Sequence, residues 1–165
     1  MNTLKLKPTT NQTRKGFTII EVVLVLAIAG LIFLMVFIAL PALQRNQRDT
    51  QRKNDLSRLK TALDSYKSNS KGQIPTQAGF NSFIDSYIKI NGEPFTDPSG
   101  TDYIFGLNYD TSSNVGWKPT DTNYHSMHFG AGMKCDGEAK VVANGMNNYS
   151  LQMKLESGGV YCIDG

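Results

Sequence analysis

The chain has 165 residues, which is enough for one domain and too few for two of ordinary size. Its formal net charge is +3, but residues 1–16 hold four basic side chains and no acidic one, which leaves −1 for residues 17–165. The basic balance therefore belongs to the first 16 residues, and it gives little support to a nucleic-acid-binding protein.

Residues 1–16 are polar and basic, and nothing in them can pack into a core. Their basic side chains are Lys5, Lys7, Arg14 and Lys15. A basic segment directly before a long apolar run is typical of a chain end that stays in the cytoplasm while the run enters a membrane.

The apolar run over residues 22–40 contains no charged and no strongly polar side chain. As a helix, residues 17–40 would extend about 36 Å, which exceeds the roughly 30 Å of hydrocarbon in a bilayer. The run is longer than the apolar core of an ordinary secretory signal, and no Ala-x-Ala cleavage site follows it. The sequence therefore predicts one membrane-spanning helix, for which a plain signal anchor is the simplest interpretation.

Glu21 argues against a plain anchor. A carboxylate in a membrane helix costs on the order of 2.5–3.5 kcal/mol at the bilayer centre and less near the interface. Such a residue usually has a partner, but residues 22–40 contain no Lys, Arg or His. The partner of Glu21 is therefore expected from a chain terminus, another subunit or the interface.

The segment from Arg14 to Glu21, RKGFTIIE, resembles the class III signal of type IV prepilins and pseudopilins. The resemblance covers about residues 14–43. It implies that a prepilin peptidase cuts after Gly16 and methylates the new N-terminal residue, Phe17. It also implies that Glu21 of an incoming subunit pairs with the terminal amine of a neighbour, so that wrong axial registers in the filament become costly.

Two residues interrupt the apolar helix. Gly30 costs about 1 kcal/mol of helix propensity, and Pro41 removes a backbone donor. Helices of related filaments melt locally between such points, so the resemblance implies a flexible segment between Gly30 and Pro41, with a gentle kink as the alternative. The expected domains are a cleaved leader at 1–16, a membrane and filament-core helix at 17–43, and an extracytoplasmic stalk helix and globular head at 44–165.

The stalk begins with an entirely polar stretch over residues 44–55. An apolar stripe follows at steps of three and four residues, which predicts that the helix continues to about Asn69 and ends near Gly72 and Pro75. The stripe consists of Leu56, Leu59, Ala62, Leu63 and Tyr66. The basic side chains of the stalk are expected to face solvent, lipid head groups, neighbouring subunits or nucleic acid. By the positive-inside rule these basic side chains would place the C-terminal side of the membrane span in the cytoplasm. The cleavage signal is more specific and takes priority, so the leader is expected in the cytoplasm instead.

The head combines a short helix with several strands. The helix is expected at 78–88, and the strands at 103–105, 126–129, 149–155 and 160–163. Residues 156–159 are expected to form a hairpin turn, and residues 108–124 are expected to form an exposed loop. The predicted fold class is α+β, a pilin-like lollipop. One long N-terminal helix, about 17–69, would pack its C-terminal half on a small antiparallel sheet.

The two cysteines, Cys135 and Cys162, would lie in an oxidising compartment, which favours a disulfide over a metal site or free thiols. Asp97 and Asp102 are a weak calcium candidate, because the stretch they bound resembles one in major pseudopilins, but acids in such stretches are more often turn formers. His125 and His128 lack partner ligands. No metal site or cofactor is predicted.

No Gly-x-Ser-x-Gly, P-loop, His-Glu-x-x-His or paired-carboxylate arrangement points to an enzyme. The predicted function is a structural subunit, the major pilin of a type IV pilus for adhesion, twitching motility or DNA uptake. Its expected partners are copies of itself, the prepilin peptidase, the assembly platform with its ATPases, and membrane lipid before assembly. The alternatives are a pseudopilin of a type II secretion or competence system, and a signal-anchored surface-binding domain that does not polymerise.

Overall fold

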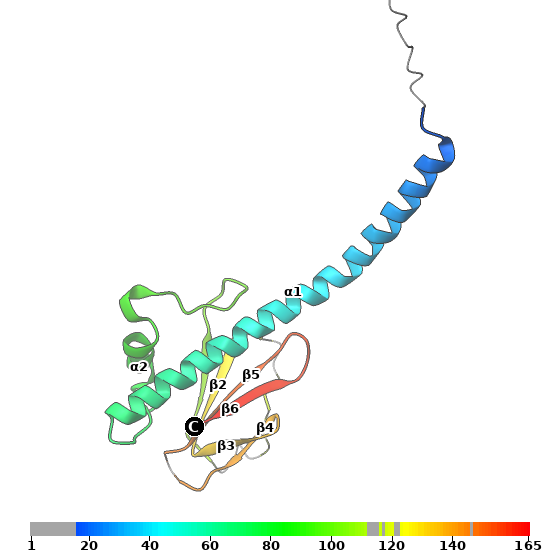
Figure 1. Cartoon of the computed structure of the whole chain (residues 1–165). Coiled ribbons are helices and arrows are strands. Elements are labelled where there is room, and N and C mark those ends of the chain that lie inside the picture. The colour runs from blue at the N-terminus through cyan, green and yellow to red at the C-terminus, as the bar shows by residue number, and fades with distance from the viewer. Residues whose placement is uncertain (1–15, 112–115, 117, 121–122, 146) are drawn as a thin grey trace, which may run out of the picture. The chain divides into compact units, whose positions relative to one another are not determined.

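The computed structural model describes residues 16–111, 116, 118–120, 123–145 and 147–165. These residues form the long helix α1 (Ile19–Asn69), the short helix α2 (Phe80–Tyr87), the single 3-10 turn η1 (Ile90–Gly92) and six strands (Figure 1). The chain divides into two units, Met1–Leu40 and Pro41–Gly165. Each unit is described by itself.

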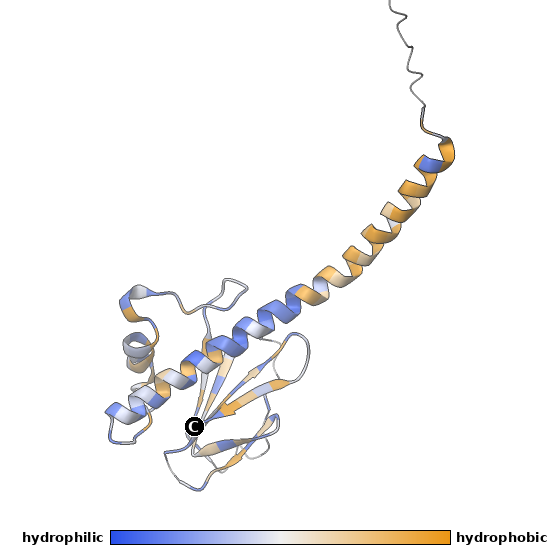
Figure 2. Cartoon of the chain, in the orientation of Figure 1, coloured by the Kyte–Doolittle hydropathy of each residue, from blue (hydrophilic) through white to orange (hydrophobic). Residues whose placement is uncertain are grey.

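The described part of the first unit consists of residues 16–18 and the N-terminal portion of α1. Its side chains are apolar around the whole circumference of the helix, as the nearly unbroken orange of this segment in Figure 2 shows. The most apolar stretch of 18 residues has a mean hydropathy of 3.2, and none of it is buried. α1 is the one helix among the described residues that is long and apolar enough to cross a membrane.

The second unit contains the rest of α1, followed by a part that we call the head, residues 70–165. Its main sheet has the strand order β1-β2-β5-β6. The strands are β1 (Ile104–Asn108), β2 (Ser126–Ala131), β5 (Tyr149–Lys154) and β6 (Val160–Asp164). β5 is antiparallel to both of its neighbours, whereas β1 and β2 run parallel, with Ile104 opposite Ser126.

The predicted α+β class is confirmed, but the expectation of a purely antiparallel sheet is wrong for β1 and β2. Parallel neighbours need a long crossover rather than a tight turn. Residues 109–125 supply the connection here, so β2 begins beside the start of β1.

One face of the sheet packs against α1 and α2 to form the core. The predicted stripe on α1 is confirmed: Leu56, Leu59 and Leu63 are completely buried. Along β2 and β5 every second side chain joins the same cluster, as the period of a strand requires. These strand residues are Met127, Phe129, Ala131, Tyr149, Leu151 and Met153.

A second hairpin covers the other face of the sheet. It consists of β3 (Met133–Asp136) and β4 (Ala139–Val142), which the sequence analysis did not predict. A side chain added at Gly130 would meet Ser150, Met133 and Lys140 atoms at 3.0–3.3 Å, so hairpin and sheet are in close contact there. This cover explains why Ser150 and Gln152 on β5 are completely buried although they point away from the core.

Candidate functional site

The start of α1 is built as a capping box. The helix begins at Ile19, and the backbone N–H and the hydroxyl of Thr18 both donate to Glu21 Oε2 at 2.8 Å. In return the Glu21 N–H lies 3.4 Å from Thr18 Oγ1. A Thr followed three residues later by a Glu satisfies donors that the first turn of a helix leaves without partners. Thr18 therefore starts the helix and orients the carboxylate of Glu21.

The residues on which cleavage and methylation are predicted are open to solvent. Phe17 is 89% exposed, and Gly16 is exposed with no atom within 4 Å of the position of an added Cβ. A peptidase that must reach the bond between these two residues would therefore meet no obstruction from the described part of the chain. Glu21 lies in the first turn of α1, four residues after Phe17.

Gly30 and Pro41 both lie inside continuous α-helix. A side chain at Gly30 would meet nothing within 4 Å, so no contact within the described chain requires a glycine there. Pro41 has no N–H to donate to the preceding turn. Local melting between these two residues stays a prediction.

Comparison with known proteins bears on this N-terminal segment. Residues 11–37 match the family model of the prokaryotic N-terminal methylation motif. The chain carries the class III signal of type IV pilins. No curated protein and no solved structure matches the chain significantly. The motif supports a membrane-anchored, pilin-like or pseudopilin-like precursor and points to a structural rather than a catalytic protein.

A buried and partly buried group of charges connects α1 to the head. We call it the Arg52 cluster, and its members are Arg48, Asp49, Arg52, Asp97 and Glu156. Arg52 is 1% exposed and binds both carboxylate oxygens of Asp97, with Nη2 2.9 Å from Oδ2. Its Nη1 donates to Glu156 Oε1 at 2.7 Å and to Asp49 Oδ1 at 3.3 Å.

Two further contacts complete the Arg52 cluster. Arg48 donates to the Glu156 carboxylate through Nη2 and, at 3.0 and 3.2 Å, through Nε. Asp49 accepts the backbone N–H groups of Glu156 at 2.9 Å and of Ser157 at 2.8 Å. Since Glu156 and Ser157 form the turn between β5 and β6, two successive turns of α1 are bound to that hairpin and to the loop that carries Asp97.

The electrostatics of the cluster favour the charged forms. Burial by itself raises the pKa of Asp97, but the hydrogen bonds from Arg52 and Ser99 and the charge of Arg52 outweigh it, so the pKa is lowered. For Asp49, burial is likewise outweighed by hydrogen bonds from Ser157, Glu156 and Arg52, and the pKa is lowered. The hydrogen bond from Arg48 lowers the pKa of Glu156. All three carboxylates are thus held ionised at neutral pH.

The expectation that the polar stretch 44–55 faces solvent or other subunits is wrong for Arg48, Asp49 and Arg52, whereas Thr50, Gln51 and Asn54 are exposed. Arg52 and Asp49 extend the buried stripe of α1 backwards from Leu56 in steps of four and three residues. That periodicity was a usable signal in the sequence. The acids that pair with Arg52 are Asp97 and Glu156. They lie 45 and 104 residues further along the chain, and no local pattern identifies them.

The basic side chains of the stalk are largely occupied within the chain, which weakens the case for nucleic acid as a partner. Besides the Arg52 cluster, Arg58 pairs with Glu93 at 3.1 Å, and Lys60 pairs with Asp64 at 2.6 Å. Lys53 lies over the Tyr161 ring, 5.6 Å from its centroid.

The two candidate calcium ligands, Asp97 and Asp102, have different surroundings. Asp97 is buried against Arg52 and also accepts the Ser99 N–H at 2.9 Å, whereas Asp102 is exposed. His128 lies on β2, and His125 precedes that strand. Within the described ranges no three His, Cys, Asp or Glu side chains are grouped so as to hold a metal ion.

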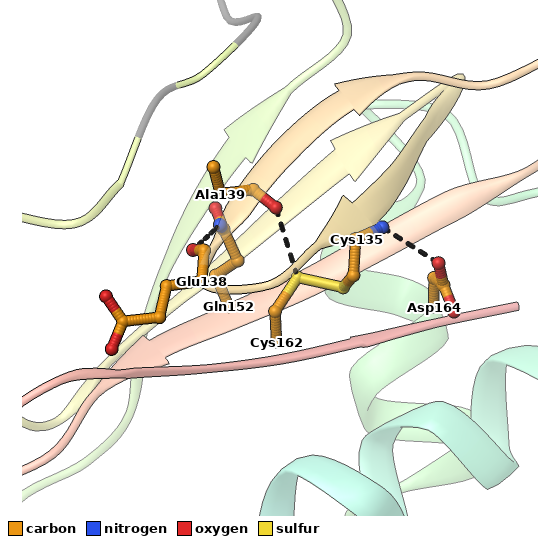
Figure 3. Close-up of a disulfide and its surroundings, with 6 residues drawn as sticks. All are labelled: Cys135, Glu138, Ala139, Gln152, Cys162 and Asp164. Carbon is orange, nitrogen blue, oxygen red and sulfur yellow. Dashed lines mark hydrogen bonds between the residues drawn. A yellow bond between two sulfur atoms is a disulfide. The ribbon is translucent and has the colours of Figure 1, made fainter.

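The predicted disulfide is confirmed. Cys135 on β3 is bonded to Cys162 on β6, with their Cα atoms 5.9 Å apart (Figure 3). The Cys135 N–H donates to Asp164 Oδ2 at 2.8 Å, and Gln152 Nε2 donates to the Glu138 carbonyl at 2.8 Å. These bonds hold the β3–β4 hairpin on the second face of the sheet.

Proposed function

We propose that the chain is the major structural subunit of a type IV pilus. The observation that carries this proposal is Glu21, a carboxylate one turn into a helix whose apolar surface is uncovered on every side. A lipid bilayer would cover that surface but would leave the carboxylate costly. A filament core built from many such helices would cover the surface and also supply a positive partner.

The proposed sequence of events starts with the precursor in the cytoplasmic membrane, its leader of residues 1–16 in the cytoplasm. The prepilin peptidase cuts after Gly16, and the Phe17 amine becomes the new N-terminus and is methylated. Residues 17–43 then leave the lipid for the filament core, while residues 44–165 remain outside the membrane. An assembly platform and its ATPases would drive this transfer, and the chain itself would catalyse nothing.

Glu21 has the role of a register device in this proposal. In an apolar core an unpaired charge is penalised, whereas a Glu21 carboxylate opposite the Phe17 amine of a neighbour is paired. Only axial positions that bring these two groups together avoid the penalty. The capping box supports this role, because Thr18 already holds the carboxylate at the start of the helix.

The processing step is tested by mass spectrometry of intact protein from membranes and from sheared cell-surface material. We expect an N-terminus at methylated Phe17. Retention of Met1 in both fractions would refute the pilin proposal and leave a signal-anchored domain that does not polymerise.

Assembly is tested by electron microscopy of the sheared fraction and by the variant Glu21→Ala. We expect long filaments with this chain as their main component, and we expect Glu21→Ala to be cleaved normally but to assemble poorly. Glu93→Ala is the matched control, since it removes an exposed acid of the head. Normal filaments from Glu21→Ala would contradict the pairing. Short filaments confined to the cell envelope would instead identify a pseudopilin.

A further inference from the structure

The stretch of α1 that follows Pro41 has no support from the head. Every side chain from Pro41 to Gln47 is exposed, and the first buried residue of α1 is Asp49. No described residue outside α1 makes a hydrogen bond or an ion pair with residues 41–47. Within the described part of the chain, the one side-chain hydrogen bond to these residues is local, from the Thr50 hydroxyl to the Asn46 carbonyl at 2.8 Å.

The support begins abruptly one turn later. Arg48 binds Glu156, Asp49 binds the β5–β6 turn, and Arg52 binds Asp97. From Leu56 onward the helix is also held by the apolar core. A helix segment opens locally at a free energy set by the tertiary contacts it loses, so the cost of opening rises steeply at this point of α1.

Pro41 weakens the helix directly before the unsupported stretch. Its ring nitrogen cannot donate to the carbonyl of Phe37, so one bond is missing from the helix ladder. The boundary between the two units of the chain falls at the same place, between Leu40 and Pro41. Residues 41–47 therefore follow a turn with a missing backbone bond, and the seven exposed residues themselves are held by their own helix hydrogen bonds alone.

We propose that residues 41–47 are a hinge between the apolar segment and the head, and that the Arg52 cluster sets the C-terminal limit of this hinge. Opening of the helix stops at Arg48 because the next turn cannot leave the head without exposing a buried ion pair. The inference rests on the proposed function for its use: in a filament the hinge would let heads adjust while the core helices stay packed.

The test is amide hydrogen exchange, followed by mass spectrometry, on the full mature chain in detergent micelles. We expect the amides of residues 42–47 to exchange at least about a hundredfold faster than those of residues 53–63. Equal protection of the two segments would overturn the proposal.

The role of the cluster is tested with Arg52→Met in the same measurement. We expect exchange at residues 49–55 to rise about a hundredfold, while the amides from Leu56 to Leu63 stay protected. Lys60→Met is the matched control, because it removes a helix cation whose pair with Asp64 is partly exposed to solvent, and it should leave the boundary in place. Glu156→Gln, a milder change in the same cluster, should move the boundary in the same direction by a smaller amount.

A boundary that stays at Arg48 in both cluster variants would refute the role of the Arg52 cluster. The measurement uses subunits in micelles and needs no filament, so the hinge and the pilus proposal can fail separately. If the chain forms filaments but hydrogen exchange shows no change in protection at Arg48, only the hinge proposal is refuted. If protection changes at Arg48 but the chain never polymerises, only the pilus proposal is refuted.

Discussion

Replacement of Arg52 should cost the head a large part of its stability. In Arg52→Met the Asp97 carboxylate, with a side chain that is 1% exposed, loses both of its bonds to the guanidinium and keeps those from Ser99. Glu156 still has Arg48, and Asp49 still has two backbone donors, so the penalty falls mainly on Asp97. Leaving one partner of a buried ion pair alone costs about 3–5 kcal/mol.

This loss is a large fraction of the total stability of a small domain, about 5–15 kcal/mol. The assay is urea unfolding of the mature chain in detergent, in which the far-ultraviolet circular dichroism signal monitors the loss of folded structure. With a slope of about 2 kcal/mol per molar, the unfolding midpoint should fall by roughly 2 M.

The control for this experiment is Lys60→Met. The side chains of Lys60 and Asp64 are 28% and 44% exposed, and a pair of that kind contributes less than about 1 kcal/mol. If Arg52→Met lay within 1 kcal/mol of the wild type at an unchanged slope, the cluster would not hold the head to α1 as argued.

Three further predictions concern the head. The pKa of Asp97 is lowered in the folded state, so its contribution to stability should be complete above the ordinary carboxyl pKa of about 4 and should be lost as the pH falls towards the folded pKa. The urea unfolding midpoint, measured from pH 7 to pH 3, checks this prediction. A midpoint that does not change below pH 4 would contradict it. Reduction of the Cys135–Cys162 bond should lower stability by roughly 3–4 kcal/mol in the chain-entropy model and add two hydrogens to the mass; no gain in mass would mean that the thiols are free. Gly106→Ala should destabilise the head by about 1–3 kcal/mol, since its Cβ would lie 2.5 Å from His128 Nδ1, and a wild-type melting temperature would refute that clash.

The sequence by itself determined the features that depend on neighbouring residues. The helix from residue 19 to residue 69, its apolar stripe, α2 and the four strands of the main sheet follow from periodicities of 3.6 and 2 residues, which are local properties. The methylation motif is local too, and so is the capping box of Thr18 and Glu21, whose spacing of three residues is visible in the sequence.

The tertiary structure alone decided the features that join distant parts of the chain. The parallel pairing of β1 with β2 joins strands that are separated by residues 109–125, and the place of the β3–β4 hairpin on the second face of the sheet depends on contacts with β5 and β6. The Arg52 cluster is the clearest case. From the sequence alone Arg48 and Arg52 belong to a solvated basic stretch, because an isolated charge is most stable in water. Folding brings Asp97 and Glu156 to them from far along the chain, and only that proximity makes their burial stable.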